Sequence, residues 1–547
     1  MKKTVFTLLA FIFTASALYA QSSMDQKVEV TNAYRSSMSA LVKNETPVNI
    51  PDSVLHFDYK FDYSFFETPY KGSYDFRPYS VNLVPEPSAR RSGKLCISLD
   101  GGYNFYPQLH AVWTPVDTAG KTVSIFNDFS GYYGKYRSLD RVLLGNGYRT
   151  PWGFDLSETF GADAKFIMKK ADLQLLAAYD GIFTDESPSG YNSGRLDASL
   201  KGHDDLRFPY TVNLHYRYAW ERPGAVANPA ALAVHGNEIK VDGTVSAMFS
   251  RKYYVWLDYL ADMDFLANAY GNQQMTFALT PYTRIYLGNF DIKLGIRLSY
   301  AYGDRFRVFP SCEASVKVLN NSMLIYAGAD GGHHNNSFYD LKTMDHHYNP
   351  GWTMPETTAE TVNGYGGFKG HIGRNFSYDI RGGYGHYVHM PFADAMTWYV
   401  SGAPSLVYTT TGIGYASARL YWDSRHVSVS GNLDFRKTVG KVSFEALDIP
   451  MFTGNLKAVY NYRKRIYAGV TLSGASSRST TLTGFYEPID VKVPGWVDLG
   501  VSLEYRLNSC WSVRFQAGNL AGCDIRRYSP FYSEKGRSFS LGLTMIL

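Results

Sequence analysis

Long runs in which apolar and polar residues alternate recur along this chain, and they restrict its fold more than any other feature. In FDIKLGIRLSY, residues 290–300, every second side chain is apolar, and residues 207–218 and 496–506 repeat the pattern. Because successive side chains of a strand point to opposite faces, each run predicts a strand with one apolar and one polar face. The last such run continues to Leu547.

The length of these runs separates two all-β folds. A β-sandwich or a propeller also shows alternation, but its strands end after about 5 or 6 residues, whereas these runs continue for about 10 or more. The polar faces carry charges of both signs, which suits a water-filled interior. The runs from residue 94 to residue 547 therefore predict an all-β fold, a transmembrane antiparallel β-barrel of about 22 strands.

The connections between the runs differ in length at the two ends of the predicted sheet. Tight turns occur at 250–251, 288–289, 320–321 and 508–509. Longer segments occupy 185–191, 221–235, 332–359, 440–451, 476–495 and 521–536. This asymmetry is typical of outer-membrane barrels, with short periplasmic turns and long extracellular loops. We expect the last strand, 537–547, to pair with the preceding strand and with the first, near Lys94 to Asp100, so that no edge is left.

The N-terminus predicts export from the cytoplasm. Lys2 and Lys3 precede an apolar run that is too short to span a bilayer, and small residues follow it. We expect a signal peptide over residues 1–20, with cleavage after Ala20 or at a competing site after Ala17. With the barrel pattern, this predicts a location in the cell outer membrane, in contact with its lipid.

Composition and motifs exclude several classes of function. The net charge of +5 over 547 residues is small, which argues against a nucleic-acid binder. The sequence contains no G-x-S-x-G, H-E-x-x-H, P-loop or dinucleotide fingerprint. We therefore predict that the protein is not an enzyme and has no cofactor.

Charged residues on the predicted polar faces are the candidates for a lumenal surface. They are His215, Arg217, Asp242, Arg284, Arg297, Asp434, Glu504 and Arg514. Their mixed signs predict a hydrated interior with salt bridges. They include no ring of charges of one sign, which is the feature that would predict ion selectivity.

One long loop is rich in histidine. Residues 331–350 contain His333, His334, His346 and His347 together with two aspartates, and these residue types bind Zn, Cu or Ni. Adjacent histidines do not easily reach one metal, and no helical i, i+4 pair is present. We therefore expect exposed loop histidines and no metal site.

The C-terminal region, 496–547, has a distinctive order of elements. A strand, a tight turn and a second strand lead to Gly518-Asn519-Leu520, and after a loop Gly536-Arg537-Ser538-Phe539 opens the final strand. This arrangement resembles the end of TonB-dependent receptor barrels. The hairpin at 450–474 is similar to barrels of this family that are common in the Bacteroidetes. The resemblance implies a Gram-negative outer-membrane transport protein, although Leu547 replaces the usual terminal aromatic residue.

The front of the chain departs from that family. Its members carry a globular plug ahead of the barrel, and residues 21–93 are too few to hold one, so TonB-driven gating is not implied. This segment instead places aromatic residues at alternate positions, namely Phe57, Tyr59, Phe61, Tyr63 and Phe65. It could form a reduced plug, a strap over the barrel mouth, or an arm that docks on a periplasmic or outer-membrane protein by strand addition. We favour the arm, because a charged lumenal wall is a poor surface on which to bury aromatic rings.

Two functions follow as hypotheses. The first is a plugless, porin-like barrel, related to TonB-dependent receptors, that binds or passes a solute. The alternative is a non-transporting scaffold or accessory subunit of an outer-membrane assembly, secretion or uptake complex.

Overall fold

The computed structural model describes residues 94–547 except 119, 139–151, 185–186, 204–207, 222–233, 251–252, 269–270, 320–321, 349–354, 395–404, 440–448, 484–487 and 528–531. The expected signal peptide and the segment 21–93, with its five aromatic candidates, lie outside the described residues. Within this part of the chain, no helix has both the length and the apolar character needed to cross a membrane.

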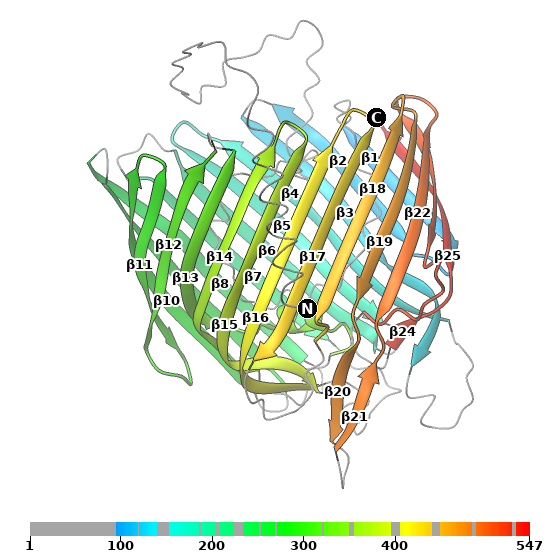
Figure 1. The fold of residues 1–547 in the computed structure, drawn as a ribbon. Helices are drawn as coiled ribbons and strands as arrows, with labels where there is room; N and C mark the ends of the chain where they lie inside the picture. The colour runs from blue at the N-terminus through cyan, green and yellow to red at the C-terminus, as the bar shows by residue number, and fades with distance from the viewer. Residues whose placement is uncertain are drawn as a thin grey trace, which may run out of the picture. The chain divides into compact units, whose positions relative to one another are not determined.

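Twenty-two strands form one closed antiparallel barrel (Figure 1). They are β1 (Leu95–Tyr103), β2 (Gln108–Thr118), β3 (Lys121–Ser138), β4 (Trp152–Ile167), β5 (Ala171–Thr184), β6 (Ser187–Gly202), β7 (Tyr210–Glu221), β8 (Val234–Ser250), β9 (Tyr253–Ala267), β10 (Asn272–Leu287), β11 (Phe290–Ala301), β12 (Arg307–Val318), β13 (Met323–His334), β14 (Thr358–Ile372), β15 (Phe376–Asp394), β16 (Ser405–Asp423), β17 (Val427–Val439), β18 (Phe452–Tyr462), β19 (Ile466–Ala475), β22 (Trp496–Arg506), β23 (Trp511–Gly518) and β25 (Ser538–Ile546). The predicted fold class is confirmed.

Four further elements of the described residues lie outside this ring of strands. The strands β20 (Arg478–Thr483) and β21 (Pro488–Val493) pair only with each other, in a hairpin that projects beyond the long-loop end (Figure 1). The short strand β24 (Tyr532–Glu534) pairs with the end of β3. The helix α4 (Phe338–Met344) lies between β13 and β14 in the sequence.

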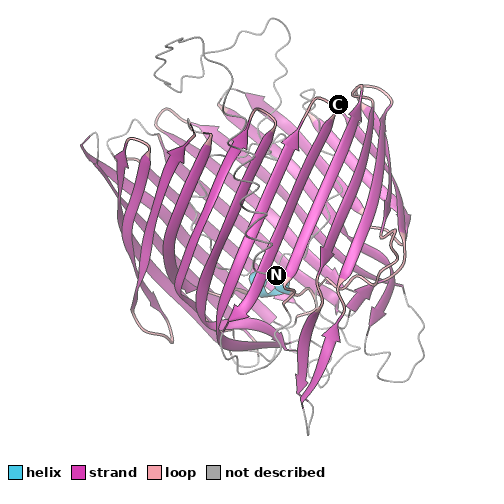
Figure 2. Cartoon of the chain, in the orientation of Figure 1, coloured by secondary structure: helices cyan, strands magenta, loops and turns pink. Residues whose placement is uncertain are grey.

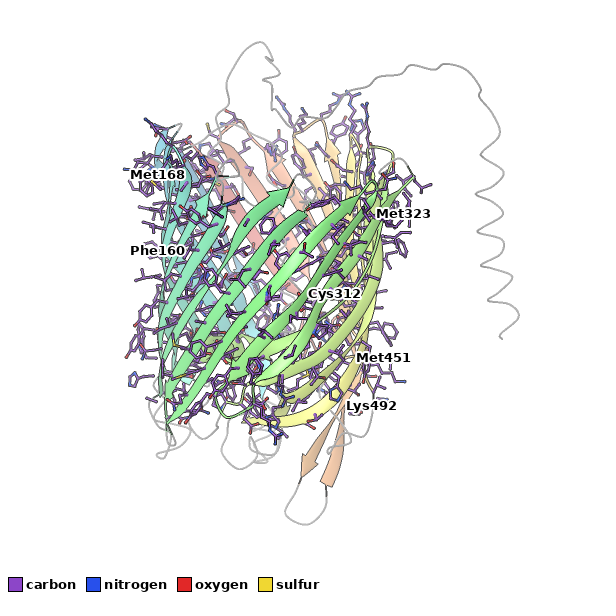
Figure 3. All side chains as sticks on the ribbon, turned by 90° about the vertical axis from the view of Figure 1, so that its left-hand side faces the viewer. Phe160, Met168, Cys312, Met323, Met451 and Lys492 are labelled. Atoms are coloured by element: carbon purple, nitrogen blue, oxygen red, sulfur yellow. The ribbon has the colours of Figure 1, made fainter. Side chains whose placement is uncertain are left out.

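The apolar face of each strand points outward. Leu294 and Leu503, at the centres of two predicted runs, are each 49% exposed, and Phe160 and Met168 lie on the outer surface of the wall (Figure 3). Exposed apolar side chains on a closed barrel form the surface that contacts lipid. The apolar residues of the alternating pattern therefore face lipid on the outside of the wall, and the polar residues face the inside.

The connections are short at one end of the barrel and mostly long at the other, as predicted. The turn between β10 and β11 needs only two residues, because Gly288 adopts a φ of +62° that glycine accepts without strain. The predicted loop at 185–191 is wrong, since β5 ends at Thr184 and β6 begins at Ser187. A bulge in this pairing, where the register shifts between Ile182 and Thr184, hides the alternation there.

The last strand closes the barrel, as predicted. β25 pairs with β23 on one side, where Arg514 lies opposite Gly542, and with β1 on the other, where Asp100 lies opposite the same glycine. Because Gly542 has no side chain, the guanidinium of Arg514 reaches across β25 and donates from Nε to Asp100 Oδ1 at 3.3 Å. The seam is therefore held by two backbone ladders and one buried ion pair.

Candidate functional site at the barrel mouth

The segment 335–348, which we name the inner loop, follows β13 in the connection to β14. It folds into the barrel instead of extending outward. Its helix α4 begins after Ser337, whose side chain accepts a hydrogen bond from the backbone N–H of Asp340. The helix is drawn in cyan between the front and rear walls, near the long-loop end (Figure 2). Phe338 and Leu341, three positions apart on one face, are both buried.

Phe338 packs on the inner faces of β5 to β9. Its ring meets that of Tyr191 edge to face, with centroids 4.9 Å apart. The same buried cluster contains Ile182, Ala219, Val234 and Leu266. These side chains lie on the face opposite the exposed apolar residues of the same strands, so the contact fixes the helix inside the wall. Burying a Phe side chain of this size stabilises such a contact by about 1.5 to 3 kcal/mol.

An ion pair holds the other side of the helix. Nζ of Lys342 lies 2.8 Å from Oε1 of Glu221 at the end of β7, and it also donates to the backbone oxygen of Tyr348 at 2.9 Å. Such a buried charge is tolerated when it is paired and hydrogen-bonded.

Arg217, one of the predicted lumenal residues, contacts the inner loop. Its guanidinium stacks on Tyr339 with Cζ 3.4 Å from the ring centroid. It also pairs with Asp180 at 3.4 Å and with Glu238 at 3.5 Å, and Glu238 accepts the backbone N–H of Tyr339 at 3.0 Å. Arg217 was predicted to face the lumen from the alternating pattern of its strand. In the structure it contacts helix α4, which the alternating pattern does not predict.

The two C-terminal histidines of the loop reach the opposite side of the mouth. Nδ1 of His346 lies 2.7 Å from Oδ1 of Asp155 on β4, and Nε2 of His347 lies 3.1 Å from the hydroxyl of Tyr136 on β3. Burial lowers the pKa of His347 to about 3, despite the opposing charge of Asp155. The prediction of exposed loop histidines is therefore wrong, because contacts from distant strands bury these rings.

A second loop, 519–537, completes this side of the mouth. Its Arg527 donates from Nε to Oε1 of Glu534 at 2.9 Å and from Nη2 to the hydroxyl of Tyr106 at 3.0 Å. Glu534 pairs through its backbone with Tyr136, the residue whose hydroxyl faces His347. Both loops therefore meet on the end of β3.

The other seven predicted lumenal residues also lie on polar faces and have polar neighbours. The pairs are His215 with Asp197 at 2.8 Å and Asp242 at 3.6 Å, Arg284 with Asp291 at 3.8 Å, Arg297 with Asp330 at 3.7 Å, Asp434 with Asn432 at 3.3 Å, Glu504 with Arg506 at 3.2 Å, and Arg514 with Asp100. They are distributed over β7, β8, β10, β11, β17, β22 and β23 and do not converge on one site. Their role in function stays a prediction.

The geometry does not support a transition-metal site built from the loop histidines. Across the described ranges, no group of three or more His, Cys, Asp and Glu side chains is arranged to hold a metal ion. The loop residues that sequence reasoning missed are Phe338, Leu341 and Lys342. The spacing of Ser337 and Asp340 around an apolar residue was the available signal, since it is typical of a helix N-terminus.

Comparison with solved structures identifies the fold. The siderophore receptor PirA from Acinetobacter baumannii matches with a TM-score of 0.60 and 10% identity, over 83% of this chain and 80% of that chain. The copper transporter OprC gives 0.58 and 11% over 83% and 80%, and the FrpB iron transporter from Neisseria meningitidis gives 0.58 and 9% over 83% and 82%. The fold is that of TonB-dependent receptor barrels.

This likeness extends to the barrel architecture. The neighbours named here are a siderophore receptor, a copper transporter and an iron transporter, and this chain shares with them a large β-barrel whose outer face is apolar. No family model matches the sequence, and no curated protein is significantly similar to it.

Proposed function

We propose that this protein binds or passes a solute through its barrel, and that the inner loop controls access to the lumen from the long-loop end. The observation that carries the proposal is the seating of the inner loop, whose Phe338, Lys342 and His346 contact strands far from β13 and β14. A barrel of about 22 strands encloses a lumen wide enough to need an obstruction.

We propose further that the protein is a plugless relative of the TonB-dependent receptors. The motifs of its last strands, Gly518-Asn519-Leu520 and Gly536-Arg537-Ser538-Phe539, support the relationship to that family. In this scheme residues 1–20 are a signal peptide, 21–93 are a periplasmic or lumenal segment without a full plug, and 94–547 are the barrel.

A scaffold function is the second candidate. The seated inner loop favours it as well, because a barrel whose mouth is occupied need not conduct. In that case the aromatic positions in 57–65 would dock a periplasmic or outer-membrane partner.

Solute flux into liposomes separates the candidates. Purified full chain and a variant without residues 21–93 are compared for uptake of sugars of increasing size, and each preparation is checked for a co-purifying protein. We expect the deletion to remove a partner and leave flux unchanged. Increased flux with no partner lost would identify the segment as a plug. If neither form, nor a form without residues 336–347, passes or binds a solute, the transport proposal fails.

A further inference from the structure

A small pocket lies between the inner loop and the ends of β8 to β10. Its lining includes Asp264, Asn272, Gln274, Asn336, Phe338 and Pro355. Gln274 joins the two sides, since its Nε2 donates to the backbone oxygen of Asn336 at 2.9 Å and its Oε1 accepts the backbone N–H of Asn336 at 3.0 Å. One wall of the pocket therefore belongs to the barrel and the other to the inner loop.

Asp264 is the unusual residue in this lining. Asp264 lines the pocket, and only 7% of the residue is exposed. Its Oδ2 is buried without a hydrogen-bond partner. A buried carboxylate oxygen that accepts no hydrogen bond is costly unless a proton or a cation neutralises it.

The surroundings of Asp264 are acidic. Glu238 lies directly opposite it on β8, and Asp262 precedes it by two residues on the same face of β9. Asp340 adds a carboxylate in the first turn of α4. The nearby guanidinium of Arg217 pairs with Asp180 and Glu238. Among the described residues, no ion pair involves Asp264.

We propose that this pocket binds a single hard cation, with Ca²⁺ as the probe, through Oδ2 of Asp264 and the amide oxygens of Asn272 and Asn336. The amide nitrogen of Asn272 donates to Pro355 O at 2.8 Å, and that of Asn336 donates to Thr358 Oγ1 at 2.9 Å, which leaves their oxygens to serve as ligands. Carboxylate and amide oxygens are the donors that Ca²⁺ prefers, and the lining contains no His or Cys for a transition metal.

The proposal has a consequence for the loop, and it rests on the proposed gating role. Asp264 and Asn272 belong to the wall, whereas Asn336 belongs to the inner loop, so a bound cation joins the two. A ligand that binds only the docked loop stabilises docking by mass action. At a Ca²⁺ concentration ten times its Kd, opening of the loop becomes about eleven times less frequent.

Hydrogen exchange and calorimetry on the full chain in detergent test this directly. We expect Ca²⁺ to bind with measurable heat and, at a concentration ten times its Kd, to slow exchange of the amides in 335–348 by about tenfold. Asp264→Asn removes the charge that needs compensation, so its inner loop should be protected without Ca²⁺ and should not respond to it. Asp423→Asn, which changes an exposed acid at the end of β16, away from the inner loop, should keep the full response.

Three results would overturn the site. They are no heat of binding in the unsubstituted protein, an Asp264→Asn variant that still responds to Ca²⁺, or protection that depends on pH alone, which would mean that Asp264 carries a proton. Solute flux measured in a chelator is independent of these results, so failure of the cation site and failure of the proposed function are distinguishable.

Discussion

Lys342 of the inner loop and Glu221 of β7 form an ion pair that water hardly reaches. Their charged atoms are 2.8 Å apart, and the two side chains are 2% and 1% exposed. The residues are separated by 121 positions in the sequence, so the pair joins a loop to a distant wall of the barrel. Each charge depends on the other for compensation.

Breaking this pair should release the inner loop. Lys342→Met leaves the carboxylate of Glu221 buried without its partner, which costs about 3 to 5 kcal/mol. Hydrogen exchange of the amides in 338–348 should accelerate strongly. The double variant Lys342→Met with Glu221→Gln removes both charges and should recover much of the protection. Unchanged exchange in Lys342→Met would show that the pair does not hold the loop.

Docking of the inner loop should weaken as the pH falls from about 6.5 toward about 3. His347 stays neutral in the docked loop because burial lowers its pKa to about 3, whereas the released ring takes up a proton near pH 6.5. Proton uptake by the released state therefore opposes docking in this window, by up to about 1.4 kcal/mol per pH unit.

Substitution of the ring separates His347 from other titrating groups. His347→Phe keeps an aromatic ring against Tyr136 and should flatten the pH dependence of exchange in the inner loop. His426→Gln, which changes an exposed histidine in the turn between β16 and β17, should leave that dependence intact. A slope that persists in His347→Phe would assign it to another group.

The seam between the first and last strands should be sensitive at Gly542. A Cβ there would overlap Oδ1 of Asp100, so Gly542→Ala should displace that carboxylate and disrupt its pair with Arg514. We expect the heat-modifiable band on gels to be lost at a lower temperature. Gly364→Ala on β14, where a Cβ meets no atom within 4 Å, is the matched control. Equal behaviour of the two variants would mean that the seam pair contributes little.

Arginine at lipid-facing positions should be costly. Leu294→Arg or Leu503→Arg should destabilise the barrel in a bilayer by roughly 2 to 4 kcal/mol near the midplane, and Ser502→Arg on the opposite face of β22 should cost much less. Gly295 is unsuitable as the inward control, because a Cβ there would overlap Tyr282. Reversible folding into lipid vesicles measures these differences, and equal losses at 502 and 503 would contradict the assigned faces.

The barrel was predictable from sequence because its physical cause is local and repeated. Because lipid contacts one face of every strand, apolar and polar residues alternate, as at 290–300 and 496–506. Because the barrel is closed, the last strand pairs with a neighbour on each side. The inner loop was not predictable in the same way. The contacts of Lys342 with Glu221 and of His346 with Asp155 join residues 121 and 191 positions apart, and no periodicity in 331–350 reports them. From sequence alone, histidine side chains in a polar loop are therefore expected to be exposed to solvent. Their burial depends on contacts with distant strands, which the sequence does not show.

The conductance of the reconstituted protein tests the central claim most directly. Residues 336–347 are replaced by a short Gly-Ser linker in the full chain, and a control variant lacks the β20–β21 hairpin, which projects away from the ring (Figure 1). We predict that single-channel conductance in planar bilayers rises several-fold when the inner loop is removed and does not change when the hairpin is removed. If removal of the inner loop leaves conductance at the level of the full chain, the inner loop does not close the barrel and the account is wrong.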